Sequence, residues 1–194
     1  MLFPKRIDDS LRGRVKDMLA AFDAGALLSA ITLALTLPDI CGARMCPREK
    51  NSSKRYVAWF NRYVAANYRS SSEGNEYYFD GSDCYQLRCV FLHEGSNAPH
   101  REKEKTVYHI AQFRIFENSP EVATDHIGRQ WSSNDPNAIF AQVDLDLARF
   151  LHSIESGVEH FLKDHPDANE YCPLTGPEIV YYSPVLDFRS ISSS

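Results

Sequence analysis

The sequence has no apolar run long enough to suggest a membrane span. Its longest stretch without a charged residue, 24–38, is fifteen residues long, whereas a transmembrane helix needs about 20 apolar residues. The stretch also contains Ser29 and Thr32 and ends at Pro38. We therefore expect a buried core helix in this segment and no membrane partner.

Cysteine is sparse, and its spacing fits neither a metal site nor a disulfide framework. The chain has five cysteines, and within each of the pairs Cys41/Cys46 and Cys84/Cys89 four residues intervene. Neither pair is Cys-x-x-Cys, so we expect no metal and no cofactor. Residues 1–10 are polar and charged and do not resemble a secretory leader. Free thiols in a reducing cytoplasm are the simplest interpretation.

The chain also lacks the overall positive charge of a general nucleic-acid coat, because its net charge is −5. The charge is uneven, with a balance of +6 over residues 1–69 and −11 over residues 70–194. The basic part can present a local surface that attracts phosphate, or the two parts can pair their charges on folding. Under the first interpretation, the RNA-binding residues are Arg44, Arg48, Lys50, Lys54 and Arg55.

Hydrophobic periodicity is the main signal that the sequence does carry, and it predicts a mainly helical domain over residues 1–165. Apolar residues recur at helical spacing in four segments, which are 11–22, 26–37, 56–64 and 147–161. We expect Pro38 to end the second helix and a basic loop to follow over 39–53. Residues 166–194 are predicted to form a carboxy-terminal tail, packed on this bundle of four or more helices or trailing from it.

A short alternating segment interrupts this helical pattern. Between 106 and 116 the alternate residues Val107, His109, Ala111, Phe113 and Ile115 share one face, which predicts a strand. Residues 138–143 are predicted to form a second short strand, with a loop over 117–137. The sequence thus predicts a small two-stranded β insertion, about 106–143, before a long final helix.

A shorter helix, predicted at about 83–94, carries the best functional clue. Ser82 or Asp83 is the expected cap, and Gly95 is the expected residue just past the helix end. Arg88 and His93 lie on this helix, five positions apart. Five positions turn a regular α-helix by about 140°, so the two side chains are not expected to share one stripe.

An arginine and a histidine beside one phosphate can cleave RNA without a metal. Arginine is a permanently charged fork that matches phosphate oxygens, and histidine exchanges a proton near neutral pH. The ribose 2′-hydroxyl supplies the nucleophile, so the protein needs no attacking serine or cysteine. A chain with seven histidines and 21 basic residues also produces such a pair by chance, so spacing alone leaves both interpretations open.

Three segments in order resemble the HEPN superfamily. They are LALTLPDICG at 33–42, SKRYVAWFNRYV at 53–64 and LRCVFLHEGS at 87–96, and the likeness to bacterial HEPN-like proteins covers about residues 10–165. The resemblance implies a HEPN-like helical bundle that forms a homodimer, with the Arg–His helices of two chains facing one cleft. It further implies a metal-independent endoribonuclease of toxin–antitoxin or phage-defence type, with RNA as substrate and an antitoxin as partner.

The same resemblance implies that Arg88 contacts the phosphate and that His93 is the general acid or base. The residue after the arginine is often Asn, Asp or His in active members, whereas here it is Cys89, whose thiol is a weak hydrogen-bond former. The alternative function is therefore a catalytically inactive HEPN-like module that binds a nucleotide, RNA or a protein.

Three further residues are accessory candidates for the site. Asp39 can orient His93 by accepting from its imidazole, or it can make a local turn bond. Asp83 can cap the helix or belong to the site. Tyr85, one turn before Arg88, can pack in the core beside the arginine stem or contact the substrate.

Overall fold

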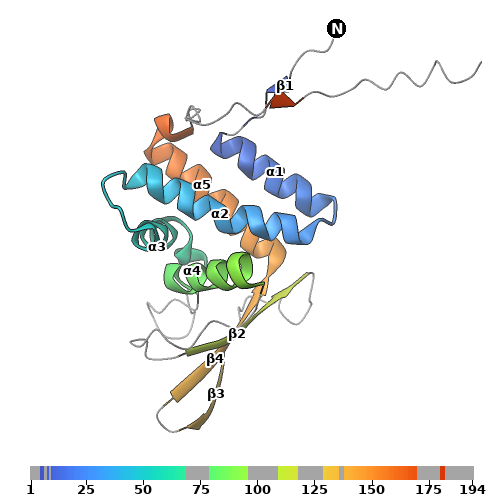
Figure 1. Cartoon of the computed structure of the whole chain (residues 1–194), viewed down its shortest axis with the longest axis vertical. Coiled ribbons are helices and arrows are strands. Elements are labelled where there is room, and N and C mark those ends of the chain that lie inside the picture. The colour runs from blue at the N-terminus through green and yellow to red at the C-terminus, as the bar shows by residue number, and fades with distance from the viewer. Residues whose placement is uncertain are drawn as a thin grey trace, which may run out of the picture.

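The computed structural model describes most of the chain, namely residues 5–6, 8, 10–68, 79–95, 109–117, 129–135, 138–169 and 180–181. Within these ranges, helices form the body of the molecule and a small sheet lies at one end of it (Figure 1). The expected fold class is confirmed, because the described residues are mainly helical and a small β element directly precedes the last long helix.

Helix α2 is the centre of the helical body. It packs against each of the other four α-helices, and its Ala30, Ala34, Leu35 and Leu37 are fully buried. The α-helices are α1 (Leu11–Asp23), α2 (Leu27–Met45), α3 (Ser52–Tyr63), α4 (Gly81–Cys89) and α5 (Leu147–Asp164).

The expectation that Pro38 ends the second helix is wrong, because α2 continues through it to Met45. Proline has no N–H, so the carbonyl of Ala34 loses its usual helical donor. Nearby carbonyls of the same turns accept from side chains instead: the Thr36 hydroxyl donates to Leu33 at 2.8 Å. Packing of α2 against the other helices stabilises the helical conformation after Pro38, which local propensity disfavours.

This continuation changes where the residues after Pro38 lie. Asp39 stands inside a helix rather than in a turn, and residues 39–45, predicted as loop, form the last part of α2. The side chain of Asp39 therefore has a fixed direction relative to the neighbouring helices.

The continuation also makes α2 the one described helix that is long and apolar enough to cross a membrane. A core helix of a soluble protein passes the same test, and α2 is packed against four helices. Its composition is accounted for by this central position.

The sheet contains the two predicted strands and one that the sequence did not predict. Strands β2 (His109–Phe116) and β4 (Ala138–Asp146) pair in parallel, and β3 (Arg129–Asp135) pairs antiparallel with β4, which is the middle strand. Residues 129–135 lie in the segment predicted as loop. Their polar sequence, RQWSSND, shows no alternation, and pairing with β4 forms the strand.

The described residues directly after α5 contact the helical body. The turn η3 (Pro166–Asn169) lies beside α1, where Asn169 Oδ1 accepts from the Arg12 backbone N–H at 3.1 Å. A two-residue strand β5 (Val180–Tyr181) pairs with β1 (Lys5–Arg6). The rest of the predicted tail, and the start of the insertion at 106–108, lie outside the described residues. The domain boundary at 165 stays a prediction.

Candidate functional site

Helix α4 begins with a reciprocal cap that lies slightly earlier than expected. Asp80, not Ser82 or Asp83, is the cap, and its Oδ1 accepts from the backbone N–H groups of Ser82 at 2.8 Å and Asp83 at 3.0 Å. The Asp83 carboxylate accepts in return from the Asp80 N–H at 3.2 Å. Asp83 is buried and closes this capping box, so it supports the helix.

The end of this helix is a wide turn. Residues Val90–Glu94 form a π-helical turn, η2, in which the Gly95 N–H donates to the Val90 carbonyl, five residues back. Gly95 has a φ of 59°, in the left-handed region, as expected for the glycine that ends a helix. Single π-helical turns are rare and frequently occur at functional sites.

The π-helical turn brings Arg88 and His93 together within one chain. Arg88 Nη1 lies 3.4 Å from His93 Nε2. The expectation that the two side chains do not share one stripe assumed regular α-helical rotation between them. A turn closed by bonds between residues five apart places such residues on one face.

Asp39 holds the other edge of the same guanidinium. Its Oδ2 lies 2.5 Å from Arg88 Nε, and the side chains are 23% and 20% exposed. The candidate role of Asp39 was to orient His93, but Arg88 stands between them. Burial raises the pKa of Asp39 above its ordinary value, and the positive charges of Arg88, Arg55 and His93 oppose this rise.

Tyr85 lies under the arginine. The Arg88 guanidinium carbon is 5.8 Å from the Tyr85 ring centroid, and the edge of the ring packs on Tyr56 with 5.4 Å between centroids. Burial raises the pKa of Tyr85, and the Cys89 thiol beside it adds to the rise. Tyr85 thus packs between Tyr56 and the arginine, and the half-buried Cys89 lies against this ring.

The predicted RNA-binding residues divide between different surroundings. Arg55 is close enough to Asp39 to lower its pKa, and its Nη1 donates to the Glu49 carbonyl at 2.7 Å. The Arg44 guanidinium donates to the Ala168 carbonyl of η3. The side chains of Arg48, Lys50 and Lys54 are exposed. The sequence grouped Arg55 with the basic segment and carried no signal that it lies beside Asp39.

A close contact between helices sets the position of Asp39 relative to Arg55. Gly42 lies one turn after Asp39 on α2, and a Cβ atom there would be 2.6 Å from the Arg55 carbonyl oxygen. Because this neighbour is backbone, a larger residue would separate α2 from α3.

We expect Gly42→Ala to lower the free energy of unfolding by about 1–3 kcal/mol, the usual cost of overpacking. Helix propensity alone would favour alanine by about 1 kcal/mol, so the two effects have opposite signs. Urea unfolding followed by circular dichroism measures the difference. The control is Ser29→Ala, an exposed position of the same helix, which should change little. Equal stability of wild type and Gly42→Ala would contradict the close contact.

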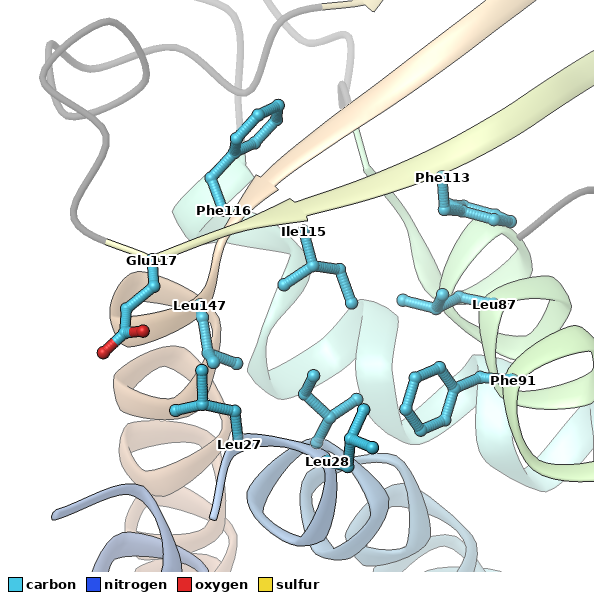
Figure 2. Close-up of a pocket in the computed structure, with 10 residues that line it drawn as sticks. Leu27, Leu28, Leu87, Phe91, Phe113, Ile115, Phe116, Glu117 and Leu147 are labelled. Carbon is cyan, nitrogen blue, oxygen red and sulfur yellow. The ribbon is translucent and has the colours of Figure 1, made fainter. Parts of the chain in front are cut away.

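Helix α2 and the α4–η2 segment both line a separate apolar pocket of about 320 Å³. Figure 2 shows Leu87 and Phe91 extending from the α4–η2 segment toward Leu28, with Ile115 and Phe113 of β2 above them. Leu28, at the start of α2, is 71% exposed. Leu87 directly precedes Arg88 in the chain. Leu87 therefore points into the apolar pocket, while its neighbour Arg88 points toward Asp39 and His93.

Metal ligands do not gather in the described ranges. No group of three or more His, Cys, Asp or Glu side chains there is arranged to hold a metal ion. The cysteines at 41, 46, 84 and 89 are free thiols, and burial raises the pKa of Cys41 to about 12. Cys172 lies outside the described residues.

Comparisons with protein-family models, curated proteins and solved structures found no match to this chain. The chemistry of the site therefore has to be argued from its own geometry.

Proposed function

We propose that this chain is a metal-independent endoribonuclease of HEPN type, in which Arg88 binds the scissile phosphate and His93 transfers the proton. The supporting observation is the 3.4 Å separation between Arg88 Nη1 and His93 Nε2. His93 is exposed and Arg88 is partly exposed, so an RNA phosphate can approach both. A guanidinium has five N–H donors, which is more than its two contacts with Asp39 and His93 use.

The contact depends on the tautomer of the imidazole. A guanidinium only donates, so Arg88 and His93 bond when His93 Nε2 accepts. In that tautomer Nε2 carries no proton and has the form of a general base, able to take the proton of a ribose 2′-hydroxyl.

The reaction is an internal transfer at phosphorus. The 2′-oxygen loses its proton to His93 and bonds to phosphorus, the bond from phosphorus to the 5′-oxygen breaks, and that oxygen gains a proton. The products are a 2′,3′-cyclic phosphate and a 5′-hydroxyl. Arg88 balances the negative charge that grows on the phosphate oxygens in the transition state. The departing oxygen takes its proton from the imidazolium of His93, or from the second His93 in a homodimer.

The homodimer, the cytoplasmic location, the antitoxin partner and the toxin or phage-defence role belong to this proposal through the sequence resemblance. A homodimer is not needed to bring an arginine and a histidine to one place, since a single chain already brings Arg88 and His93 together. In a homodimer each chain would contribute such a pair to a shared cleft.

The test is cleavage of single-stranded RNA by the purified protein in EDTA. We expect cleavage to continue in the chelator and to leave 2′,3′-cyclic phosphate ends, seen by mass spectrometry of the fragments. The same oligonucleotide with 2′-O-methyl groups should stay intact, because its 2′-oxygen has no proton to lose. Cleavage that stops in EDTA, or that cuts the methylated strand, would contradict the proposal.

A second candidate function is a catalytically inactive module that binds a nucleotide, RNA or a protein. The Asp39–Arg88 ion pair favours it, because a carboxylate already balances the arginine charge. RNA binding whose affinity falls steeply with salt, with no cleavage, indicates an RNA-binding module. Salt-insensitive binding of a mononucleotide indicates a nucleotide-binding one.

A further inference from the structure

Charged groups from three helices surround the carboxylate of Asp39. Asp39 belongs to α2, Arg55 to α3, Arg88 to α4 and His93 to the turn that follows it. The positive charges of Arg88, Arg55 and His93 all act on Asp39. With one acid and two arginines, this cluster keeps a net positive charge even when Asp39 is ionised, and it can attract a phosphate.

The two contacts of Arg88 use different edges of its planar fork. Asp39 Oδ2 meets Nε at 2.5 Å, and His93 Nε2 is 3.4 Å from Nη1. The contact at Nε is an ion pair, and this buried nitrogen makes no hydrogen bond with the described residues. The ion pair restricts rotation of the long side chain and leaves the Nη edge beside the imidazole. Tyr85 lies beside the guanidinium, with 5.8 Å between the guanidinium carbon and the ring centroid.

This arrangement has a cost to the folded state. Half-burial removes water from the Asp39 carboxylate, and this effect exceeds the attraction of the neighbouring cations, because its pKa is raised rather than lowered. A charge kept at the expense of stability is typical of functional sites.

We propose that Asp39 is the positioning residue of the phosphate site, holding Arg88 by Nε so that the Nη edge of the guanidinium faces both the RNA phosphate and His93. The inference rests on the proposed function and deepens it. Asp39 does not touch the substrate and acts through Arg88. The Arg88 guanidinium then has two separate tasks: its Nε side is held by Asp39, and its Nη side binds the RNA phosphate.

The kinetic test is Asp39→Asn, which keeps the shape and removes the charge. We expect kcat to fall about 10²-fold, the cost of misplacing a catalytic group by about 1 Å. KM for the RNA should stay within about threefold, because the variant also loses a negative charge. Asp39→Glu should restore part of kcat. The control Glu159→Gln, which breaks an exposed ion pair with Arg12, should leave both constants unchanged.

Stability separates positioning from structural damage. The folded pKa of Asp39 lies above its ordinary value of 3.8, so the folded state keeps this proton to higher pH than the unfolded state. Wild type should therefore lose stability relative to Asp39→Asn as pH rises above about 3.8 through the folded pKa. The groups facing Asp39 are Arg88 and His93 on the α4–η2 segment and Arg55 and Tyr56 on α3. At pH 7 the Asn variant should be at least as stable as wild type, and a lower Tm would overturn the inference.

A binding cycle distinguishes this inference from the ribonuclease proposal. Kd for the 2′-O-methyl oligonucleotide is measured in wild type, Asp39→Asn, Arg88→Ala and the double variant. If Asp39 positions Arg88, Arg88→Ala should weaken binding about tenfold in wild type and less than threefold in the Asn background. Additive effects overturn the positioning role, whether or not RNA is cut. Coupled binding without any cleavage overturns the ribonuclease proposal and leaves Asp39 as the residue that positions Arg88 for binding.

Discussion

His93→Ala is expected to reduce the rate of RNA cleavage by about 10²–10⁴-fold, the usual contribution of a positioned acid or base. His93 is exposed and stands in the last turn before Gly95, so its removal deletes the proton carrier without opening a cavity. The free energy of unfolding should therefore stay close to that of wild type. Initial rates on a labelled RNA, at matched concentrations in EDTA, measure the effect.

The control for this variant is His152→Ala. His152 is an exposed histidine of α5 that contacts Glu155 at 3.1 Å, and it lies on a different helix from the candidate site. Its loss should leave cleavage unchanged. Equal activity of His93→Ala and wild type would mean that the site is wrong or that the activity comes from a contaminating nuclease.

The arginine can be tested in the same assay by two substitutions. Arg88→Ala removes the charge and should lower cleavage as strongly as His93→Ala. Arg88→Lys keeps the charge but has no fork, so it cannot contact Asp39 and His93 through two edges at once. We expect the lysine variant to remain close to the alanine variant in kcat. Full activity in Arg88→Lys would show that charge alone is sufficient.

Trp59→Ala is expected to have the largest effect on stability, a loss of about 3–5 kcal/mol in the free energy of unfolding. Trp59 is fully buried on α3. Its ring lies 6.3 Å from Phe161 of α5 and 5.7 Å from Tyr63, measured between centroids. It therefore joins the two helices, and its loss leaves a cavity that the neighbouring rings cannot fill. Urea unfolding followed by circular dichroism gives the value.

Trp59→Phe is the matched variant. The indole Nε1 is buried and has no hydrogen-bond partner among the described residues, and an unpaired buried donor costs about 1–3 kcal/mol. Phenylalanine keeps an aromatic ring and removes that donor, so it should cost less than half as much as alanine. Equal losses for both variants would contradict this description of the core.

The sequence predicted those elements in which periodicity and burial agree. The last helix was expected from apolar periodicity over 147–161 and is observed as Leu147–Asp164, because one apolar face packs on the core. The central helix was cut short at Pro38, since a local rule about proline cannot include packing against four other helices. The strand at 129–135 was missed because its polar residues carry no β pattern and its pairing with β4 is a tertiary effect.

The sequence named three residues that the structure brings together, but it did not give their geometry. Arg88, His93 and Asp39 were all named from the sequence, yet the expected partner of Asp39 was the imidazole and the observed one is the guanidinium. That pairing depends on the continuation of α2, which the proline concealed. The approach of His93 to Arg88 depends on a π-helical turn, and no apolar periodicity encodes such a turn.

The wide turn at Val90–Glu94 means that residue count and three-dimensional distance are separate properties of this pair. In an ordinary α-helix, an arginine and a histidine with three residues between them lie on one face. Here four residues intervene, and the π-helical turn accommodates the additional residue. Two chains with different gaps between these residues can therefore present the same constellation to a substrate. The relationship between such chains is better judged from the distance between the arginine and histidine side chains than from the number of residues between them.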